Sequence, residues 1–301
     1  MALASGFNAG SRSGTPPLEV TLKRGCISES MHRVHAVVCD GRGRVLMCAG
    51  DPGFETFIRS ALKPFQALPF ISSGAAAQME VGDGGIAIAC ASHAGTNAHA
   101  REAFKLLWKA ELETAQLQCP VPAGAESPLQ HNCSGKHAAF LATSRKMIWP
   151  LESYLQSDHP LQVEINRRVA ELLGLPPDEL VAARDDCGAP TLRLQLAQMA
   201  LLYAHLGASR HAELEQISRA MLAHPDLVAG EGHVAAADGA ERLVLLVAFF
   251  LVDPAQKANA QTSRACDGGR VLLRSPIPRM VPAHAPHLNA VDLHAVALPV
   301  A

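Results

Sequence analysis

Length, composition and charge narrow the possible classes of protein before any motif is considered. The chain has 301 residues, enough for one large domain or two, and its 26 Lys and Arg nearly balance its 28 Asp and Glu. It therefore lacks the basic excess that binding to nucleic acid or an anionic membrane requires, and an aromatic content of 4% excludes extensive base-stacking surfaces.

The terminal region and the cysteines indicate the compartment. Residues 1–17 are small and polar without an apolar centre, so we expect a disordered leader and not a secretory signal. Eight cysteines are scattered without a compact framework, as suits a reducing compartment. The longest apolar run, residues 243–252, is too short to cross a bilayer and predicts a core strand or helix. We expect a soluble, cytoplasmic protein.

Two regions have strand character. Residues 34–39 and 44–48 are β-rich and flank Asp40-Gly41-Arg42-Gly43, whose glycines accept positive φ, so we predict a hairpin. Residues 86–90 form a short apolar run before a polar cluster, and we predict a buried strand that ends at a site.

Helical periodicity dominates the middle of the chain. An amphipathic pattern over 97–112 places Phe104, Leu107 and Trp108 on the inward face. A helical pattern also runs from Ser60 to a stop at Gly74. Further helices are predicted over 138–147, 161–173, 191–206 and 212–222. Without a repeat or a clear linker, we expect one α+β domain over residues 18–301, with a mixed or antiparallel sheet and a helical subdomain.

Ser60 and Lys63 form the first candidate site. Their spacing places both side chains on one face of a helix, where a lysine of lowered pKa can remove the proton of a serine nucleophile. Arg59 adds positive charge, and Pro64 favours a helix that starts at the serine, with its amides directed at a developing oxyanion. By itself, a Ser-x-x-Lys pattern is more often a helix cap followed by a solvated lysine.

Two cysteines and an amine form a second candidate site. Cys133 and Lys136 are three residues apart, and Cys187 lies beside an acidic pair, so the three could meet at a zinc ion. The alternative is that both cysteines are small buried hydrophobic residues and that Lys136 and His137 lie on a surface loop that caps the next helix.

Two other polar pairs leave alternatives open. Ser92 with His93 fits a second nucleophile or proton relay, but such a dipeptide after a strand is more often a turn whose hydroxyl bonds the backbone. Asp185 and Asp186 could orient a substrate amine or cap a helix that begins at Thr191.

Taken together and in this order, the motifs resemble those of the Rhizobium-type (thermolabile, class 3) L-asparaginase family. The resemblance covers residues from about 18 to 230. The matching segments are Glu29-Ser30-x-His32, Arg59-Ser60-x-x-Lys63-Pro64-x-Gln66, Cys90-Ala91-Ser92-His93, Asn132-Cys133-Ser134-Gly135-Lys136-His137 and Asp185-Asp186-Cys187-Gly188-Ala189-Pro190.

The resemblance implies a fold similar to that of serine β-lactamases and hydrolysis of L-asparagine to L-aspartate and ammonia. It implies that Ser60 is the nucleophile, Lys63 its base and Ser92 part of a second serine–lysine pair. Arg59 would lie close to the substrate. We also expect a homodimer.

The resemblance also assigns the remaining polar residues. It implies a zinc ion bound by Cys133, Lys136 and Cys187 near the substrate. His137 and Asp185 would shape the substrate pocket, with Asp185 holding the α-amino group.

The chain departs from the family pattern after about residue 230. The family continues to a Lys-x-Gly-Ala-Glu-Gly segment that supplies the lysine partner of the second serine, and Lys257 is the corresponding candidate here although the acidic residue and glycines are missing. One alternative is therefore a weakened or inactive relative that binds an amino acid or zinc without turnover. Another is a different serine–lysine acyl hydrolase, but the Ser-Asp-Asn and Lys-Thr-Gly motifs of β-lactam-binding proteins do not occur.

Overall fold

The computed structural model describes residues 16–208, 210–230, 251–252 and 272–274. Almost all of the predicted leader, Lys257 and most of the 243–252 run lie outside the described residues. The strands are β1 (Leu18–Arg24), β2 (Ile27–Cys39), β3 (Val45–Ala49), β4 (Glu55–Phe57), β5 (Val181–Arg184), β6 (Pro190–Gln195), β7 (Leu251–Val252) and β8 (Leu272–Arg274). The helices are α1 (Lys63–Gln66), α2 (Leu68–Ser72), α3 (Ala75–Gln78), α4 (Asp83–Ala89), α5 (Asn97–Lys109), α6 (Ser134–Lys146), α7 (Pro160–Leu173), α8 (Leu196–Gly207), α9 (Ala212–Ala223) and α10 (Pro225–Val228).

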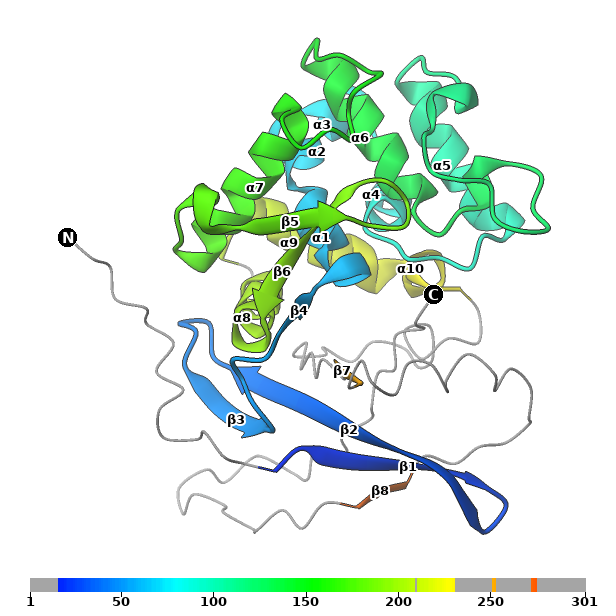
Figure 1. The fold of residues 1–301 in the computed structure, drawn as a ribbon. Helices are drawn as coiled ribbons and strands as arrows, with labels where there is room; N and C mark the ends of the chain where they lie inside the picture. The colour runs from blue at the N-terminus through cyan, green and yellow to red at the C-terminus, as the bar shows by residue number, and fades with distance from the viewer. Residues whose placement is uncertain (1–15, 209, 231–250, 253–271, 275–301) are drawn as a thin grey trace.

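An antiparallel sheet and a group of helices form the two parts of the fold (Figure 1). The sheet has the strand order β3-β2-β1-β8, and β7 also pairs with β2. The predicted hairpin is confirmed as β2 and β3, and the Asp40 carboxylate accepts hydrogen bonds from the amides of Arg42 and Arg44 in its turn. Helix α8 packs against β2 and joins the sheet to the helical part. The predicted α+β class is confirmed.

A second small sheet has the order β4-β6-β5 and lies beside the helices (Figure 1). The predicted helix over 191–206 is wrong in its first part, because residues 190–195 form strand β6 and α8 begins only at Leu196. Strand β6 pairs with β4 and β5 along its two edges. Pairing on both sides outweighs the helical propensity of this segment.

The apolar run at residues 86–90 is helical, so the predicted strand is wrong. It belongs to α4, where Ile86 and Ile88 are completely buried among α5, α6 and α9. A short run that is apolar on every side carries no periodicity that separates a buried strand from a buried helix.

The segment from Ser60 to Gly74 is helical in short pieces. Arg59–Leu62 form a 3-10 turn, α1 follows at once, and α2 begins after Ala67 with Pro69 near its start. Because proline has no amide hydrogen, it interrupts a continuous helix and restarts the next one. The predicted stop is confirmed, with Gly74 in the left-handed conformation at φ 76°.

Two other helices differ from prediction. Phe104 and Trp108 are 41% and 72% exposed, so they do not face inward as expected, whereas Leu106 and Leu107 are buried. Helix α6 begins at Ser134 and not at residue 138, which places Lys136 and His137 on a buried helix and not on a surface loop. Helices α7 and α9 are confirmed within one residue.

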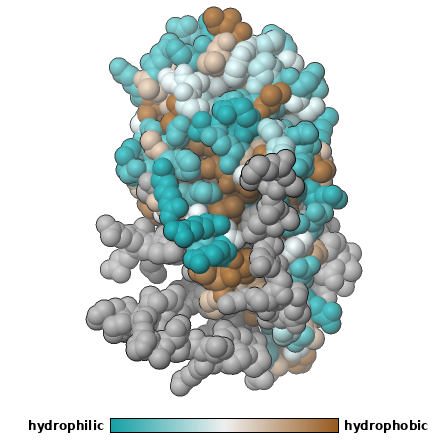
Figure 2. Space-filling view, turned by 90° about the vertical axis from the view of Figure 1, so that its left-hand side faces the viewer, coloured by the Kyte–Doolittle hydropathy of each residue, from teal (hydrophilic) through white to brown (hydrophobic). Residues whose placement is uncertain are grey.

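The face in Figure 2 is mostly hydrophilic over the helical part, with hydrophobic side chains in small groups. Within the described part of the chain, none of the helices combines the length and apolarity required to cross a bilayer.

Candidate functional site

Two serine hydroxyls meet at the centre of the candidate site. Ser60 lies on the 3-10 turn after β4, and Ser92 lies just after α4. The Ser92 hydroxyl donates to Ser60 Oγ over 3.3 Å, and the Asn132 side-chain amide donates to Ser92 Oγ over 3.4 Å. Both serines are partly exposed. The two serines are therefore not sealed inside the core.

The candidate base, Lys63, is fully buried. Its Nζ atom donates to the Asn132 carbonyl over 3.1 Å. Burial lowers the pKa of Lys63 because it disfavours the ammonium form, whereas the Cys133 thiolate favours that form. The amine therefore lies where it can change protonation state, three residues from Ser60 on the same helical segment.

Cys133, Lys136 and Cys187 are brought together as the sequence predicts. All three are buried, and Lys136 Nζ donates to Cys187 Sγ over 3.3 Å. The pKa of Cys133 is lowered to about 5, first by a hydrogen bond from Cys187 and then by the charges of Lys136 and Lys63. Facing this thiolate, Cys187 has a raised pKa. The two sulfurs thus share one negative charge between two lysines.

This donor set fits a zinc ion. Two sulfurs and one amine are buried in contact, and zinc accepts sulfur and nitrogen ligands. The described residues contain no cluster of three His, Cys, Asp or Glu arranged to hold a metal. A metal at this position would therefore require Lys136 as its third ligand, as the sequence predicts.

Arg59 and the acidic pair form the outer edge of the site. Arg59 donates through Nε to Asp185 Oδ1 over 3.1 Å and also pairs with Asp186. Asp185 lies in the turn between β5 and β6, so it does not cap a helix at Thr191. Its side chain is 9% exposed, against 79% for Asp186. Asp185 is therefore the better placed of the two to bind a charged group inside the site.

The backbone of Arg59 is strained. Its φ is 51°, in the left-handed region that a residue with a Cβ rarely adopts. Hydrogen bonds from the Arg59 amide to Thr191 Oγ1 and from the Ile58 amide to the Leu192 carbonyl hold this conformation against β6. Such strain costs about 1–3 kcal/mol and is concentrated at functional sites.

Sequence reasoning missed several residues that hold the site together. Asn132 contacts both Ser92 and Lys63, and Gln66 Nε2 donates to the Pro190 carbonyl, which ties α1 to the loop of Cys187. Tyr154 hydrogen-bonds His137. Asn132 and Gln66 fall inside recognised motifs, which was a usable signal, whereas Tyr154 lies in none.

Ser92 is held by the backbone on both sides of it. The amides of Ser92 and Ala94 donate to the carbonyls of Val228 and Ala229 over 3.0 and 2.8 Å. His93, between them, is buried and contacts Ser134 Oγ through Nε2 over 3.0 Å. The two residues therefore differ in position. Ser92 belongs to the site, whereas the His93 side chain lies in the interior and contacts Ser134.

We expect His93 to make the fold sensitive to acid. Burial, helped by nearby His99, Lys63 and His131, lowers the pKa of His93 from 6.5 to about 2. Below pH 6.5 the unfolded chain takes up a proton at this residue and the folded chain does not, so stability falls as the pH falls, by about 1.4 kcal/mol per pH unit. Urea unfolding from pH 7 to pH 5 should show this loss.

The His93→Gln variant should lose less stability over this pH range than the wild type. The exposed His211→Gln serves as the matched control and should behave like the wild type. Equal pH dependence in all three proteins would contradict a buried, neutral His93.

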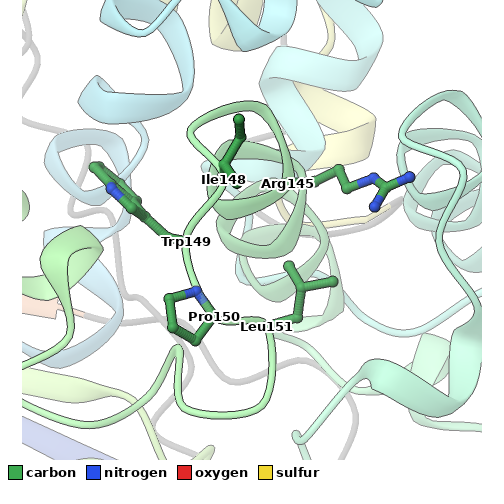
Figure 3. Close-up of a pocket in the computed structure, with 5 residues that line it drawn as sticks. All are labelled: Arg145, Ile148, Trp149, Pro150 and Leu151. Atoms are coloured by element: carbon green, nitrogen blue, oxygen red, sulfur yellow. The ribbon is translucent and has the colours of Figure 1, made fainter.

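A surface pocket lies elsewhere in the helical part, at the end of α6 (Figure 3). It is lined by Arg145, Ile148, Trp149, Pro150 and Leu151. It contains none of the predicted site residues. We therefore place the candidate site at Ser60 and Ser92, not in this pocket.

The chain matches the model of one known protein family. The family model described as L-asparaginase II matches residues 20–237, which is most of the chain. The chain belongs to the L-asparaginase II family. The family predicted from the motifs is thus confirmed, and it places this asparaginase relative among amidohydrolases that act on asparagine. A search of curated proteins gave no match.

The matched region of this asparaginase-family chain contains almost all of the predicted site residues. Only Lys257 lies beyond residue 237 and outside the described residues. The second serine–lysine pair therefore stays a prediction.

Proposed function

We propose that the chain hydrolyses the side-chain amide of L-asparagine through an acyl-enzyme on Ser60. The observation that carries this proposal is the contact between the Ser60 and Ser92 hydroxyls, together with Asn132, which contacts both Ser92 and the buried amine of Lys63. Family membership supports the substrate.

In the proposed reaction, neutral Lys63 takes the Ser60 proton while Oγ attacks the amide carbon. Nearby hydrogen-bond donors stabilise the resulting oxyanion. Collapse breaks the C–N bond, and the amine leaves as ammonia with a proton from the lysine. Water then hydrolyses the aspartyl ester, which releases aspartate and restores the Ser60 hydroxyl. Ser92, with Lys257 as its proposed partner, would pass protons during these steps.

The remaining residues would bind the substrate. Asp185 would hold the α-ammonium group and Arg59 the α-carboxylate, while His137 shapes the inner wall. Cys133, Lys136 and Cys187 would hold zinc, which supplies a Lewis acid and a fixed positive charge beside the substrate when it is bound.

We also propose that the fold is similar to that of serine β-lactamases. A helical part beside an antiparallel sheet, with the nucleophile on a turn that opens a helix, supports the serine β-lactamase-like arrangement. We also propose a cytoplasmic homodimer, which light scattering on the purified chain would test.

The function is tested by incubating the purified full chain with asparagine and zinc and measuring ammonia. Acid quenching during turnover, followed by peptide mass spectrometry, should find an aspartyl adduct on the peptide that contains Ser60. Ammonia release with an adduct on another residue would contradict the assigned nucleophile.

A second candidate function is binding without turnover. It is favoured by the end of the family match at residue 237, before Lys257. Asparagine would then raise the melting temperature without ammonia release. Ammonia release that Lys257→Ala abolishes would instead support the complete second serine–lysine pair.

We expect Asp185→Asn to raise the KM for asparagine by about 10- to 100-fold. A charge-assisted hydrogen bond contributes about 1.5–3 kcal/mol, and the buried carboxylate would make one to the substrate ammonium group. The matched control is Asp186→Asn, which removes an exposed carboxylate that also pairs with Arg59. Because exposed ion pairs contribute at most about 1 kcal/mol, its KM should change by no more than about fivefold. Equal effects of both variants in steady-state kinetics would exclude a special role of Asp185.

A further inference from the structure

Tyr154 is completely buried, and its hydroxyl has two neighbours in the described structure. The amide of Gln118 donates to the hydroxyl oxygen over 2.9 Å. Nδ1 of His137 lies 2.7 Å from the same oxygen. The Gln118 amide can only donate, so the hydroxyl hydrogen of Tyr154 remains available for His137.

This arrangement determines which nitrogen of His137 carries the proton. If Nδ1 accepts the Tyr154 hydrogen, both hydroxyl contacts are satisfied. If Nδ1 were protonated, the Tyr154 hydrogen would lose its acceptor, and a buried unsatisfied donor costs about 1–3 kcal/mol. Neutral His137 therefore carries its hydrogen on Nε2.

The other ring nitrogen, Nε2, is buried and has no hydrogen-bond partner among the described residues. The His137 side chain also interacts with that of Cys187. Because Nδ1 is occupied by Tyr154, Nε2 is the nitrogen that remains for Cys187. A protonated Nε2 can donate a hydrogen bond to sulfur but has no lone pair for a metal.

We propose that Tyr154 and His137 act as a positioning pair that fixes the Nε2–H tautomer and directs this N–H group at the sulfur of Cys187. His137 then orients a metal ligand without being one, as outer-shell hydrogen-bond donors do. Cys133, Lys136 and Cys187 would remain the residues that hold the metal. The role at the metal rests on the proposed function, whereas the tautomer does not.

The tautomer is tested on the metal-free full chain labelled with ¹⁵N at histidine. The spectrum of His137→Gln identifies the signals of His137 by their absence. We expect an unprotonated Nδ1 and a protonated Nε2 in the wild type. Tyr154→Phe should shift His137 to a mixture of tautomers, because Nδ1 loses its donor. A protonated Nδ1 in the wild type would overturn the proposal.

The role at the metal is tested by zinc affinity, measured in competition with a chelating dye. His137→Leu removes the donor and should weaken zinc binding by about 10- to 100-fold. His137→Gln keeps an amide oxygen for Tyr154 and an N–H group for Cys187, so its affinity should stay close to that of the wild type. Unfolding curves of the metal-free variants show whether the substitutions themselves change the stability of the fold.

Each outcome decides one part of the proposal. Equal loss of zinc affinity in His137→Leu and His137→Gln would overturn the donor role and indicate that the imidazole itself binds zinc. If the wild type binds no zinc, the metal site of the proposed function fails and the positioning role at the metal with it, while the histidine spectrum still decides the tautomer.

Discussion

Replacing Ser60 with alanine is expected to lower asparagine hydrolysis by about 10⁴-fold or more, because the variant retains the pocket but has no atom to form the acyl-enzyme. Ser92 lies 3.3 Å from Ser60, but the proposed reaction assigns it to proton transfer and not to attack on the amide. Ammonia release under single-turnover conditions measures the loss.

The control for this variant is Ser28→Ala, which removes an exposed hydroxyl on β2. Its rate should equal that of the wild type. Asparagine should still raise the melting temperature of Ser60→Ala, because binding does not require the nucleophile. Activity in Ser60→Ala close to the wild-type value would show that another residue attacks the amide.

Replacing Gly135 with alanine is expected to lower the free energy of unfolding by about 2 kcal/mol. Gly135 lies in the first turn of α6, and a Cβ placed there would come within 2.1 Å of the Ile88 carbonyl oxygen on α4. The clash is with backbone, so the two helices must separate, at a cost of about 1–3 kcal/mol. Alanine has a higher helix propensity than glycine, and this difference offsets at most about 1 kcal/mol of that cost.

Gly82→Ala is the matched control for this variant. Gly82 precedes α4 with φ −76°, and a Cβ there would meet no atom within 4 Å. Urea unfolding followed by circular dichroism should separate the two variants clearly. Because Cys133 and Lys136 flank Gly135, zinc affinity should fall in Gly135→Ala and not in Gly82→Ala. A Gly135→Ala protein as stable as the wild type would contradict the close packing of α4 and α6.

Much of the fold could be predicted where a local signal was strong. The turn at Asp40–Gly43 specified the β2–β3 hairpin, and regular apolar spacing specified α7 and α9. Prediction failed where burial on all sides removed the periodicity, as in α4, and where pairing with two strands changed residues 190–195 from helix to strand.

The candidate site, like the fold, could be predicted only in part. The chemical types and the order of its motifs were readable in the sequence, and they led to the family that the comparison confirms. The sequence could not reveal that Asn132 bridges Lys63 and Ser92, because this contact joins a helix start, a turn and a loop far apart in the chain.

The sequence by itself determined the family, the candidate reactive groups and the short elements whose signals are local. Only the tertiary structure decided that Ser60 lies against Ser92, that Lys136 is buried against Cys187 and that the Tyr154 hydroxyl contacts His137. The physical reason is that these contacts depend on how α4, α6 and the β5–β6 turn pack together. Packing is set by many distant side chains at once, and no local pattern records it.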